Sequence, residues 1–274
     1  IFFAIKGNKF DGNNYIKDAI KKGAKIIITE NKIDFKNKGV IFLKIKNPRK
    51  LLAELSYKFI KVNIKKLVAV TGTNGKSSVA DFYYQILNLN KKKVASIGTI
   101  GVQLNNKKKE IENTTLDPIK LCKIINELGF KKIDHIILEA SSHGLKQNRL
   151  DGLSFDLGIF TNLSHDHLDY HKSLKSYLKS KLYLFENLIK KNGQIILDST
   201  IPQFDKIKKI YNKKKIRLAT VFGKNSDLEL ISHIYDNEQQ ILKIRYKSKI
   251  FNIKLNLIGK IQIKNILMAI LTAI

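Results

Sequence analysis

A short glycine-containing loop has the residue types needed to bind phosphate. It reads Thr71-Gly72-Thr73-Asn74-Gly75-Lys76-Ser77-Ser78 and lies between an apolar strand predicted at 67–70 and a helix predicted at 77–89. Such a loop directs backbone N–H groups and a helix N-terminus at phosphate oxygens, while its lysine offers a positive charge and Ser77 a hydroxyl group for Mg²⁺. Val70 stands where the first glycine of the full Walker sequence would fall, so the loop is a shortened form. The alternative interpretation is an ordinary glycine turn.

An acidic residue marks the end of a second predicted strand. Glu139 follows the apolar residues 136–138 and opens the segment Glu139-Ala140-Ser141-Ser142-His143-Gly144-Leu145. A carboxylate at the carboxyl end of a parallel strand faces the crevice in which such sheets bind ligands. Glu139 is therefore placed to hold Mg²⁺ beside nucleotide phosphates, and its alternative role is to cap a helix.

A third polar segment follows the next predicted strand and is rich in histidine. The segment Thr161-Asn162-Leu163-Ser164-His165-Asp166-His167-Leu168-Asp169-Tyr170-His171 contains three of the six histidines of the chain and two aspartates. This density is compatible with a zinc site, although no cysteine is nearby, and equally with a second magnesium site or a proton relay. A solvated polar loop is the alternative.

A fourth segment, Ser180-Lys181-Leu182-Tyr183-Leu184-Phe185-Glu186-Asn187, falls within a predicted helix. Its pattern is that of an amphipathic helix packed on a core. From the residues alone we expect Lys181 on the solvent-exposed face, without a chemical role.

Alternating strands and helices predict an α/β protein whose central sheet is mostly parallel and covered by helices on both faces. The small connector 62–66 predicts a boundary between an N-terminal α/β domain, 1–63, and a central domain, 64–274. A turn is expected at 7–14, and antiparallel strands at 240–246 and 250–257. The other predicted strands are 1–5, 25–29, 40–45, 94–97, 133–139, 157–161 and 194–197, and the other predicted helices are 15–22, 51–60, 119–128 and 174–189.

Composition narrows the class of protein. The 274 residues are 43% hydrophobic, which is enough for a sizeable core, and the one cysteine, Cys122, excludes an intrachain disulfide. No apolar run approaches the roughly 20 residues that span a bilayer. We expect a cytoplasmic monomer without membrane insertion. The first residue is Ile1 and the last residues form an apolar helical run, so we also expect a fragment of a longer chain.

The formal net charge of +28 could favour nucleic-acid binding. The positive charge is nearly all lysine, however, and Arg49, Arg149, Arg217 and Arg245 are the only arginines. Recognition of bases and phosphates favours the planar guanidinium group. We therefore expect a solvated lysine-rich surface and no nucleic-acid partner.

Taken in order, the four segments resemble the central domain of the Mur ligases. Two further stretches, Glu112-Asn113-Thr114-Thr115 and 141–149, resemble the elements with which the tripeptide-forming member binds a UDP-N-acetylmuramoyl-peptide. Residues 1–12 are similar to its uridine-binding first domain. Two departures are Ser77, where the family usually has threonine, and Asn8-Lys9-Phe10, where it has His-Gln-Ala.

The resemblance implies roles for individual residues. Gly72, Thr73, Asn74, Gly75, Lys76, Ser77 and Ser78 would bind ATP, and the catalytic residues would be Lys76, Glu139, His167 and Lys181. A first Mg²⁺ would be held by Ser77 and Glu139, and a second by Glu139 and His167. Lys181 would be carbamylated by CO₂ to N6-carboxylysine. Contacts to the muramoyl-peptide would come from Asn113, Thr114, Thr115, Ser141, Gln147 and Arg149.

The same resemblance implies an ATP-dependent ligase of peptidoglycan synthesis. It would join a third amino acid to UDP-N-acetylmuramoyl-L-alanyl-D-glutamate through an acyl phosphate; we expect meso-diaminopimelate, with L-lysine as the alternative. Another Mur ligase or a folate polyglutamate ligase is the first rival, although the latter should have glycine directly after Lys76. The second alternative is a non-enzymatic basic nucleic-acid-binding protein. This function would explain the net positive charge but none of the motifs.

Overall fold

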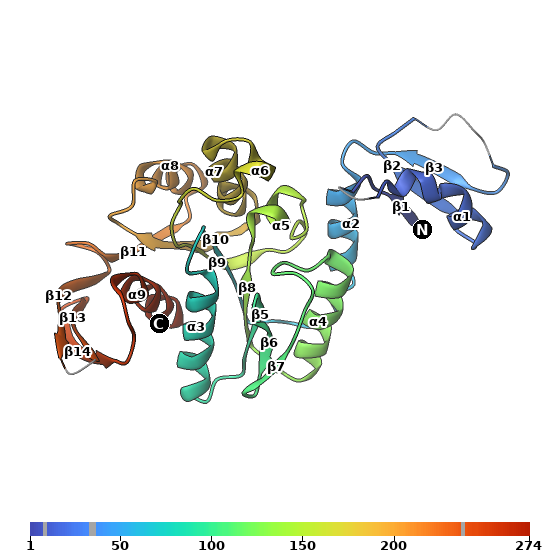
Figure 1. Ribbon diagram of the computed structural model, residues 1–274. Coiled ribbons are helices and arrows are strands. Elements are labelled where there is room, and N and C mark those ends of the chain that lie inside the picture. Colours follow the sequence, from blue (N-terminus) through green and yellow to red (C-terminus); the bar gives the residue numbers. More distant parts are fainter. Residues whose placement is uncertain (8–9, 33–36, 237–238) are drawn as a thin grey trace.

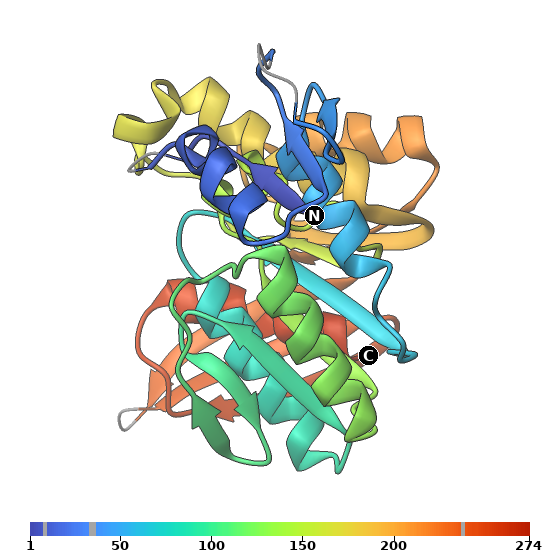
Figure 2. The same ribbon diagram turned by 90° about the vertical axis from the view of Figure 1, so that its right-hand side faces the viewer.

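The computed structural model describes residues 1–7, 10–32, 37–236 and 239–274, and it contains two β-sheets (Figure 1). Residues 8 and 9, which belong to the expected turn and to the departure at Asn8-Lys9-Phe10, lie outside the described residues. The smaller sheet and the first helix lie to one side of the larger sheet and are joined to it through helix α2 (Figure 1, Figure 2).

The smaller sheet consists of three parallel strands in the order β1-β2-β3. Ala4, Ile16 and Ile27 form its small core, and Asp11 caps the turn that precedes the helix by accepting a hydrogen bond of 2.9 Å from the backbone N–H of Asn13. The elements are β1 (Phe2–Ala4), the 3₁₀ turn η1 (Gly12–Tyr15), α1 (Ile16–Lys21), β2 (Ile26–Thr29) and β3 (Ile41–Lys44).

Among the described residues, eleven strands form the larger sheet, in the order β14-β13-β12-β11-β10-β9-β4-β8-β5-β6-β7. The stretch from β12 to β5 is parallel throughout, and both ends of the sheet are antiparallel. The strands are β4 (Lys66–Thr71), β5 (Val94–Gly98), β6 (Gly101–Leu104), β7 (Lys107–Lys109), β8 (His135–Glu139), β9 (Phe155–Phe160), β10 (Ile189–Asp198), β11 (Arg217–Phe222), β12 (Leu228–Asp236), β13 (Gln239–Tyr246) and β14 (Lys249–Leu255).

Strand β4 occupies the point at which the chain changes direction across the sheet. It lies between β8 and β9, yet the chain runs from β4 past β8 to β5 and later returns past β4 to β9. In open α/β sheets, ligands bind outside the carboxyl ends of the strands at such a point. The loop that follows Thr71 at the end of β4 is therefore in the expected position for a ligand site.

Helices cover both faces of the larger sheet because its strands are apolar on both sides. Successive residues of β4 alternate between two cores: Leu67 and Ala69 enter one, and Val68 and Val70 the other. Helices α3 and α9 pack together over one face (Figure 1). The helices are α2 (Pro48–Tyr57), α3 (Lys76–Leu89), α4 (Pro118–Phe130), α5 (Ser142–Lys146), α6 (Leu168–His171), α7 (Leu174–Tyr183), α8 (Phe204–Lys214) and α9 (Lys260–Ala273).

The predicted fold class is confirmed, with some differences in its elements. The expected helix 174–189 ends at Tyr183 and continues as a π-helical turn, Leu184–Leu188, before β10 begins. The expected antiparallel strands extend the main sheet. No range was predicted for strands β6, β7, β11 and β12 or for helices α5, α6 and α8. The domain boundary at 63/64 stays a prediction; Ala53 and Tyr57 of α2, on the N-terminal side of it, pack into the larger core.

The two edge strands of the larger sheet differ in composition. β7 consists of three exposed lysines, 107–109. β14 exposes Ile250 and Phe251.

Candidate nucleotide and substrate site

The glycine loop between β4 and α3 is held against the start of the loop that follows β9. Thr73 donates its backbone N–H to the Asn162 carbonyl at 3.0 Å, and the Thr161 hydroxyl donates to the Asn74 carbonyl at 2.6 Å. A Cβ on Gly72 would lie 1.8 Å from Thr161 Oγ1, and one on Gly75 would lie 2.5 Å from Asn265 Oδ1 of α9. Gly75 also has a φ of 85°, so both glycines are required for this loop.

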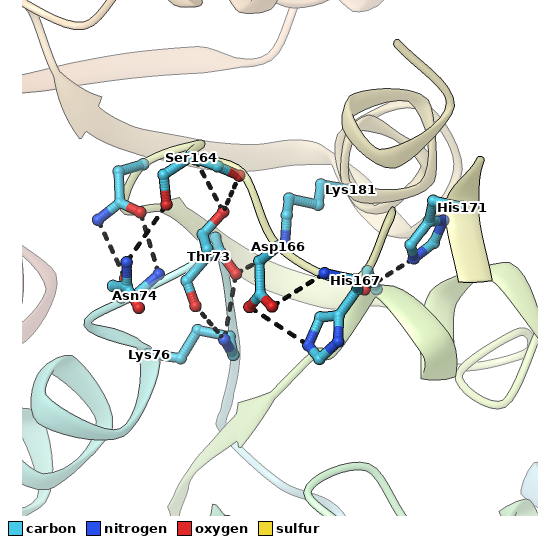
Figure 3. Close-up of polar contacts among 11 residues, drawn as sticks. Thr73, Asn74, Lys76, Ser164, Asp166, His167, His171 and Lys181 are labelled. Carbon is cyan, nitrogen blue, oxygen red and sulfur yellow. Dashed lines mark hydrogen bonds and ion pairs between the residues drawn. The ribbon is translucent and has the colours of Figure 1, made fainter. Parts of the chain in front are cut away.

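Two lysines bind the same backbone carbonyl of the loop. Lys76 Nζ donates to the carbonyl oxygens of Gly72 and Thr73 at 3.1 and 2.7 Å, and Lys181 Nζ donates to that of Gly72 at 2.6 Å. Figure 3 shows both amines directed at the loop, Lys76 from α3 and Lys181 from α7. The amines of two lysines therefore lie within hydrogen-bond distance of one oxygen of the loop.

The expected solvent-exposed position of Lys181 is wrong. The side chain is buried, with 1% relative exposure, and its amine lies 4.1 Å from the centre of the Tyr177 ring. Tyr177, Leu178 and Lys181 lie close together on helix α7, and the side of the helix that carries them is buried. Burial, and secondarily the charge of Lys76, lowers the pKa of Lys181 to about 6.

Glu139 lies at the carboxyl end of β8 with 2% exposure. Its carboxylate accepts hydrogen bonds from the Ser77 hydroxyl at 3.0 Å, the Thr99 N–H at 2.8 Å and the Thr99 hydroxyl at 3.2 Å. A Cβ on Gly98 would lie 2.2 Å from Glu139 Oε1, so glycine is needed there for the carboxylate to fit. A carboxylate and a hydroxyl beside a phosphate loop are oxygen donors of the kind that Mg²⁺ prefers, and they fit one such ion.

The three histidines of the segment after β9 differ in exposure. His165 and His167 are exposed, and His167 Nε2 lies 3.4 Å from Asp166 Oδ2 (Figure 3). His171 is buried, its Nε2 is 3.0 Å from Ser142 Oγ, and burial lowers its pKa to about 4. Within the described parts of the chain, no three His, Cys, Asp or Glu side chains are grouped to hold a metal ion, so the zinc alternative has no support.

A second network connects the stretch before α4 with the loop after α5. The Thr115 hydroxyl donates to the Glu139 carbonyl at 2.8 Å and accepts the Ser141 N–H at 2.9 Å. Arg149 donates to the Thr115 carbonyl at 2.5 Å and to Gln147 Oε1 at 2.8 Å. The predicted peptide-binding residues are thereby tied to the strand end that carries Glu139.

One cavity of about 630 Å³ joins the two groups of predicted residues. It is lined by Thr73, Asn74, Gly75, Lys76, Ser77, Ser78, Thr99, Asn113, Thr114, Thr115, Ser141, His143, Gln147, Arg149 and His167. Three predicted site residues do not line the cavity but are hydrogen-bonded next to it. Glu139 is bonded to Ser77, Gly72 to Lys76, and Lys181 to Gly72. Thr99 and His143 were not predicted as site residues; His143 stands in the Ser-Ser-His-Gly segment, and Thr99 follows the glycine that ends β5.

Comparison with known proteins decides the family. The sequence profile of the Mur ligase middle domain matches residues 70–273, and that described as Mur ligase family, catalytic domain, matches residues 1–60. The chain belongs to the Mur ligase family.

Individual relatives agree with this membership. The chain is 40% identical over 276 residues to the UDP-N-acetylmuramoyl-L-alanyl-D-glutamate--2,6-diaminopimelate ligase of Rickettsia montanensis, which covers 99% of this chain and 57% of that protein. It thus spans a little over half the length of the curated relatives that it matches. A solved structure of a ligase of the same name superposes with a TM-score of 0.87 at 23% identity, covering 99% of this chain and 56% of the other.

A more distant Mur ligase structure shares the fold. The MurF ligase of Thermotoga maritima in complex with ADP superposes with a TM-score of 0.67 at 20% identity, covering 99% of this chain and 58% of the other. In the described part of this Mur ligase chain, no helix is long and apolar enough to cross a membrane.

Replacing Thr99 with valine should raise the Mg²⁺ concentration needed for half-maximal activity of a full-length enzyme containing this Mur ligase chain. The change removes the hydroxyl that bonds Glu139 and Thr114 while leaving the backbone N–H that bonds Glu139. The prediction assumes that Glu139 binds Mg²⁺, as the resemblance implies; loss of a group that orients a metal ligand typically weakens metal affinity by about 10-fold or more. A magnesium titration measures the effect, and Thr99→Ser, which keeps the hydroxyl, is the matched control. Coincident curves for the valine variant and the parent would contradict the role.

Proposed function

We propose that this chain supplies the ATP- and UDP-muramoyl-peptide-binding parts of a ligase that adds 2,6-diaminopimelate to UDP-N-acetylmuramoyl-L-alanyl-D-glutamate. The observation that carries the proposal is the single cavity into which both the glycine loop and the Asn113–Thr115 and Ser141–Arg149 stretches project. The 35–40% identity to relatives named for that reaction supports diaminopimelate over L-lysine. We also propose that the reaction takes place in the cytoplasm.

The arrangement suits transfer of a phosphoryl group to a carboxylate. The terminal carboxylate of the dipeptide attacks the γ-phosphorus of ATP, a bond from carboxylate oxygen to phosphorus forms, and the bond to the ADP oxygen breaks. The amine of diaminopimelate then attacks the acyl carbon and expels phosphate. Catalysis of this kind consists mainly of positioning and charge neutralisation.

In the proposed reaction, different residues of the cavity bind ATP, the muramoyl-peptide and Mg²⁺. The N–H groups of the loop and the Lys76 amine hold the ATP phosphates, and Arg149 with Gln147 orients the muramoyl-peptide. Ser77 and Glu139 would hold Mg²⁺, which would offset the negative charge of ATP and the carboxylate. His167 lines the same cavity and remains a proposed ligand of a second ion.

Formation of ADP measures the proposed reaction directly. A full-length enzyme containing this chain should release ADP only when ATP, UDP-N-acetylmuramoyl-L-alanyl-D-glutamate and diaminopimelate are all present, and mass spectrometry should detect the tripeptide product. L-Lysine in place of diaminopimelate tests the alternative amino acid, and dihydrofolate with glutamate tests the folate ligase. ADP release with the folate substrates alone would overturn the proposal. A DNA titration over a salt series tests the basic-protein alternative.

Substituting the proposed metal ligands should change the magnesium requirement without unfolding the protein. Glu139→Gln and His167→Ala each remove one proposed ligand while the apolar sheet stays intact, so the Mg²⁺ concentration for half-maximal rate should rise steeply in both. Glu54→Gln, which alters a partly exposed carboxylate on α2, is the control. The roles would be withdrawn for any variant whose magnesium titration superimposes on that of the parent.

A further inference from the structure

A turn between α5 and β9 carries two of the proposed muramoyl-peptide contacts, Gln147 and Arg149, with Asn148 between them. Asn148 has a φ of 55°, in the left-handed region that non-glycine residues seldom adopt. Asparagine reaches this region more readily than most residues, but the conformation still has to be held by its surroundings. The direction in which the turn presents Arg149 to the main cavity therefore depends on the contacts of Asn148.

Three side chains bind the side chain of Asn148. Its Oδ1 accepts a hydrogen bond of 3.0 Å from Nδ2 of Asn47, the residue that caps the N-terminus of α2. Its Nδ2 lies 3.1 Å from Asp151 Oδ2 and 3.2 Å from the hydroxyl oxygen of Tyr183, the last residue of α7. Asn148 thus connects the turn to both α2 and α7 (Figure 1).

A buried carboxylate completes this network. Asp151 is 3% exposed, its Oδ1 accepts the Tyr183 hydroxyl at 2.6 Å, and Lys50 Nζ lies 3.9 Å from the same oxygen. Burial, and next the hydrogen bond to Asp151, raises the pKa of Tyr183, so its hydroxyl keeps the proton and acts as the donor. Removing the hydroxyl would leave a buried carboxylate oxygen short of a partner, which weakens the whole network.

The contacts of Arg149 depend on the position of the turn. The Tyr57 hydroxyl donates to the Arg149 carbonyl at 2.7 Å, and the guanidinium group donates to the Thr115 carbonyl and to Gln147 Oε1. The guanidinium fork is planar and rigid, so it makes several hydrogen bonds at once only from one backbone position. A small shift at Asn148 would misdirect the fork.

We propose that Tyr183 and Asp151 are positioning residues for binding of the muramoyl-peptide. They hold Asn148 in its left-handed conformation and thereby direct Arg149 into the main cavity. The inference rests on the proposed function and extends it to two residues that do not line that cavity. Lys181, on the same helix as Tyr183, bonds the glycine loop instead, so ATP binding should be little affected.

Steady-state kinetics of a full-length enzyme containing this chain test the proposal with Tyr183→Phe, which removes only the hydroxyl. The KM for UDP-N-acetylmuramoyl-L-alanyl-D-glutamate should rise about 3- to 10-fold, the range expected for one lost hydrogen bond. The KM for ATP and kcat should stay close to those of the parent. A merely structural role would reduce the amount of active enzyme and so lower kcat, without a selective change in the KM of one substrate.

Three further variants serve as controls. Asp151→Asn keeps an acceptor for the Tyr183 hydroxyl but loses the one for Asn148, so its KM should lie between those of the parent and Asp151→Ala. Tyr211→Phe, at a partly buried tyrosine of α8 that packs on the same core as Tyr183, should match the parent. Thermal unfolding of each variant shows whether it is folded.

A double-mutant cycle measures whether Tyr183 acts through Arg149. Arg149→Met should raise the KM for the muramoyl-peptide by itself. Adding Tyr183→Phe to it should cause little further change, because the side chain that Tyr183 positions is already gone. If the double variant instead shows the product of the two single effects, the positioning role is wrong.

Other results would overturn the inference as well. An unchanged KM for the muramoyl-peptide in folded Tyr183→Phe would remove Tyr183 from this role, and an equal rise in the KM for ATP would show a general disturbance instead of positioning. Failure of the proposed function is visible in the parent alone, as ADP release that does not depend on the UDP-muramoyl-peptide. The two failures are therefore distinguishable.

Discussion

Replacing Lys181 with alanine should leave the protein folded and remove most of the ligase activity of a full-length enzyme containing this chain. The Gly72 carbonyl keeps Lys76 as a donor in the variant, so the loop retains a hydrogen bond at that oxygen. The buried amine, in contrast, has a pKa lowered to about 6 by burial and by Lys76, so it is mostly neutral at pH 7. A neutral amine is the form that adds CO₂.

The proposed carbamate explains the expected loss. Addition of CO₂ to the neutral Lys181 amine forms a nitrogen–carbon bond and releases one proton, which converts an uncharged side chain into an anionic carbamate. Such an anion could help to fix Mg²⁺ or Lys76 beside the ATP phosphates. Alanine at this position cannot supply it.

Rescue by a small carboxylate measures this prediction. Acetate or formate can occupy the vacated space, so activity of Lys181→Ala should rise with its concentration, whereas chloride at matched ionic strength should have no effect. Lys179→Ala, an exposed change on the same helix, is the matched control. Full activity of the unrescued Lys181 variant would remove this residue from the site.

Replacing Lys76 with alanine should abolish ligation. Lys76 is the lysine of the glycine loop that lines the cavity, and in the proposed reaction ATP and a carboxylate would bring several negative charges there. Loss of such a group costs roughly 10³-fold or more in rate for phosphoryl transfer. The expected turnover is therefore at or below the detection limit of an ADP-release assay.

A separate ATP-binding measurement shows whether the effect is local. Lys76→Ala should bind ATP more weakly than the parent, while binding of the UDP-muramoyl-peptide stays within a few-fold. Lys92→Ala, an exposed change just beyond α3, should match the parent in both assays. Near-normal turnover of a correctly folded Lys76→Ala enzyme would overturn the assignment of ATP to this loop.

The parts of the site that could be predicted from sequence are those built from neighbouring residues. The glycine loop needs Gly72 and Gly75 within a few positions of Lys76, and a carboxylate that ends an apolar strand, such as Glu139, must face the ligand edge. Contacts between segments that are distant in the sequence could not be predicted. Thr99 lies 40 residues from Glu139 and becomes a partner only because β5 pairs with β8.

The burial of Lys181 could not be predicted from the sequence for a different reason. A lysine in a helix is usually solvated, since burying an ammonium group without a partner is costly. Here the helix lies against the glycine loop, and the Gly72 carbonyl, 109 residues away in sequence, provides the partner. The β6–β7 hairpin, by contrast, had a local signal: Asn105 and Asn106 have φ of 49° and 59°, which Asn tolerates better than most residues.

The composition of the two edge strands affects how readily each can pair with a strand of a second molecule. Adjacent lysines on β7 repel a second copy of themselves, which discourages strand pairing between molecules. The charged residues of β14 are Lys249 and Lys254, and between them Ile250 and Phe251 are 51% and 45% exposed. Association between purified molecules should thus start at the β14 end of the sheet.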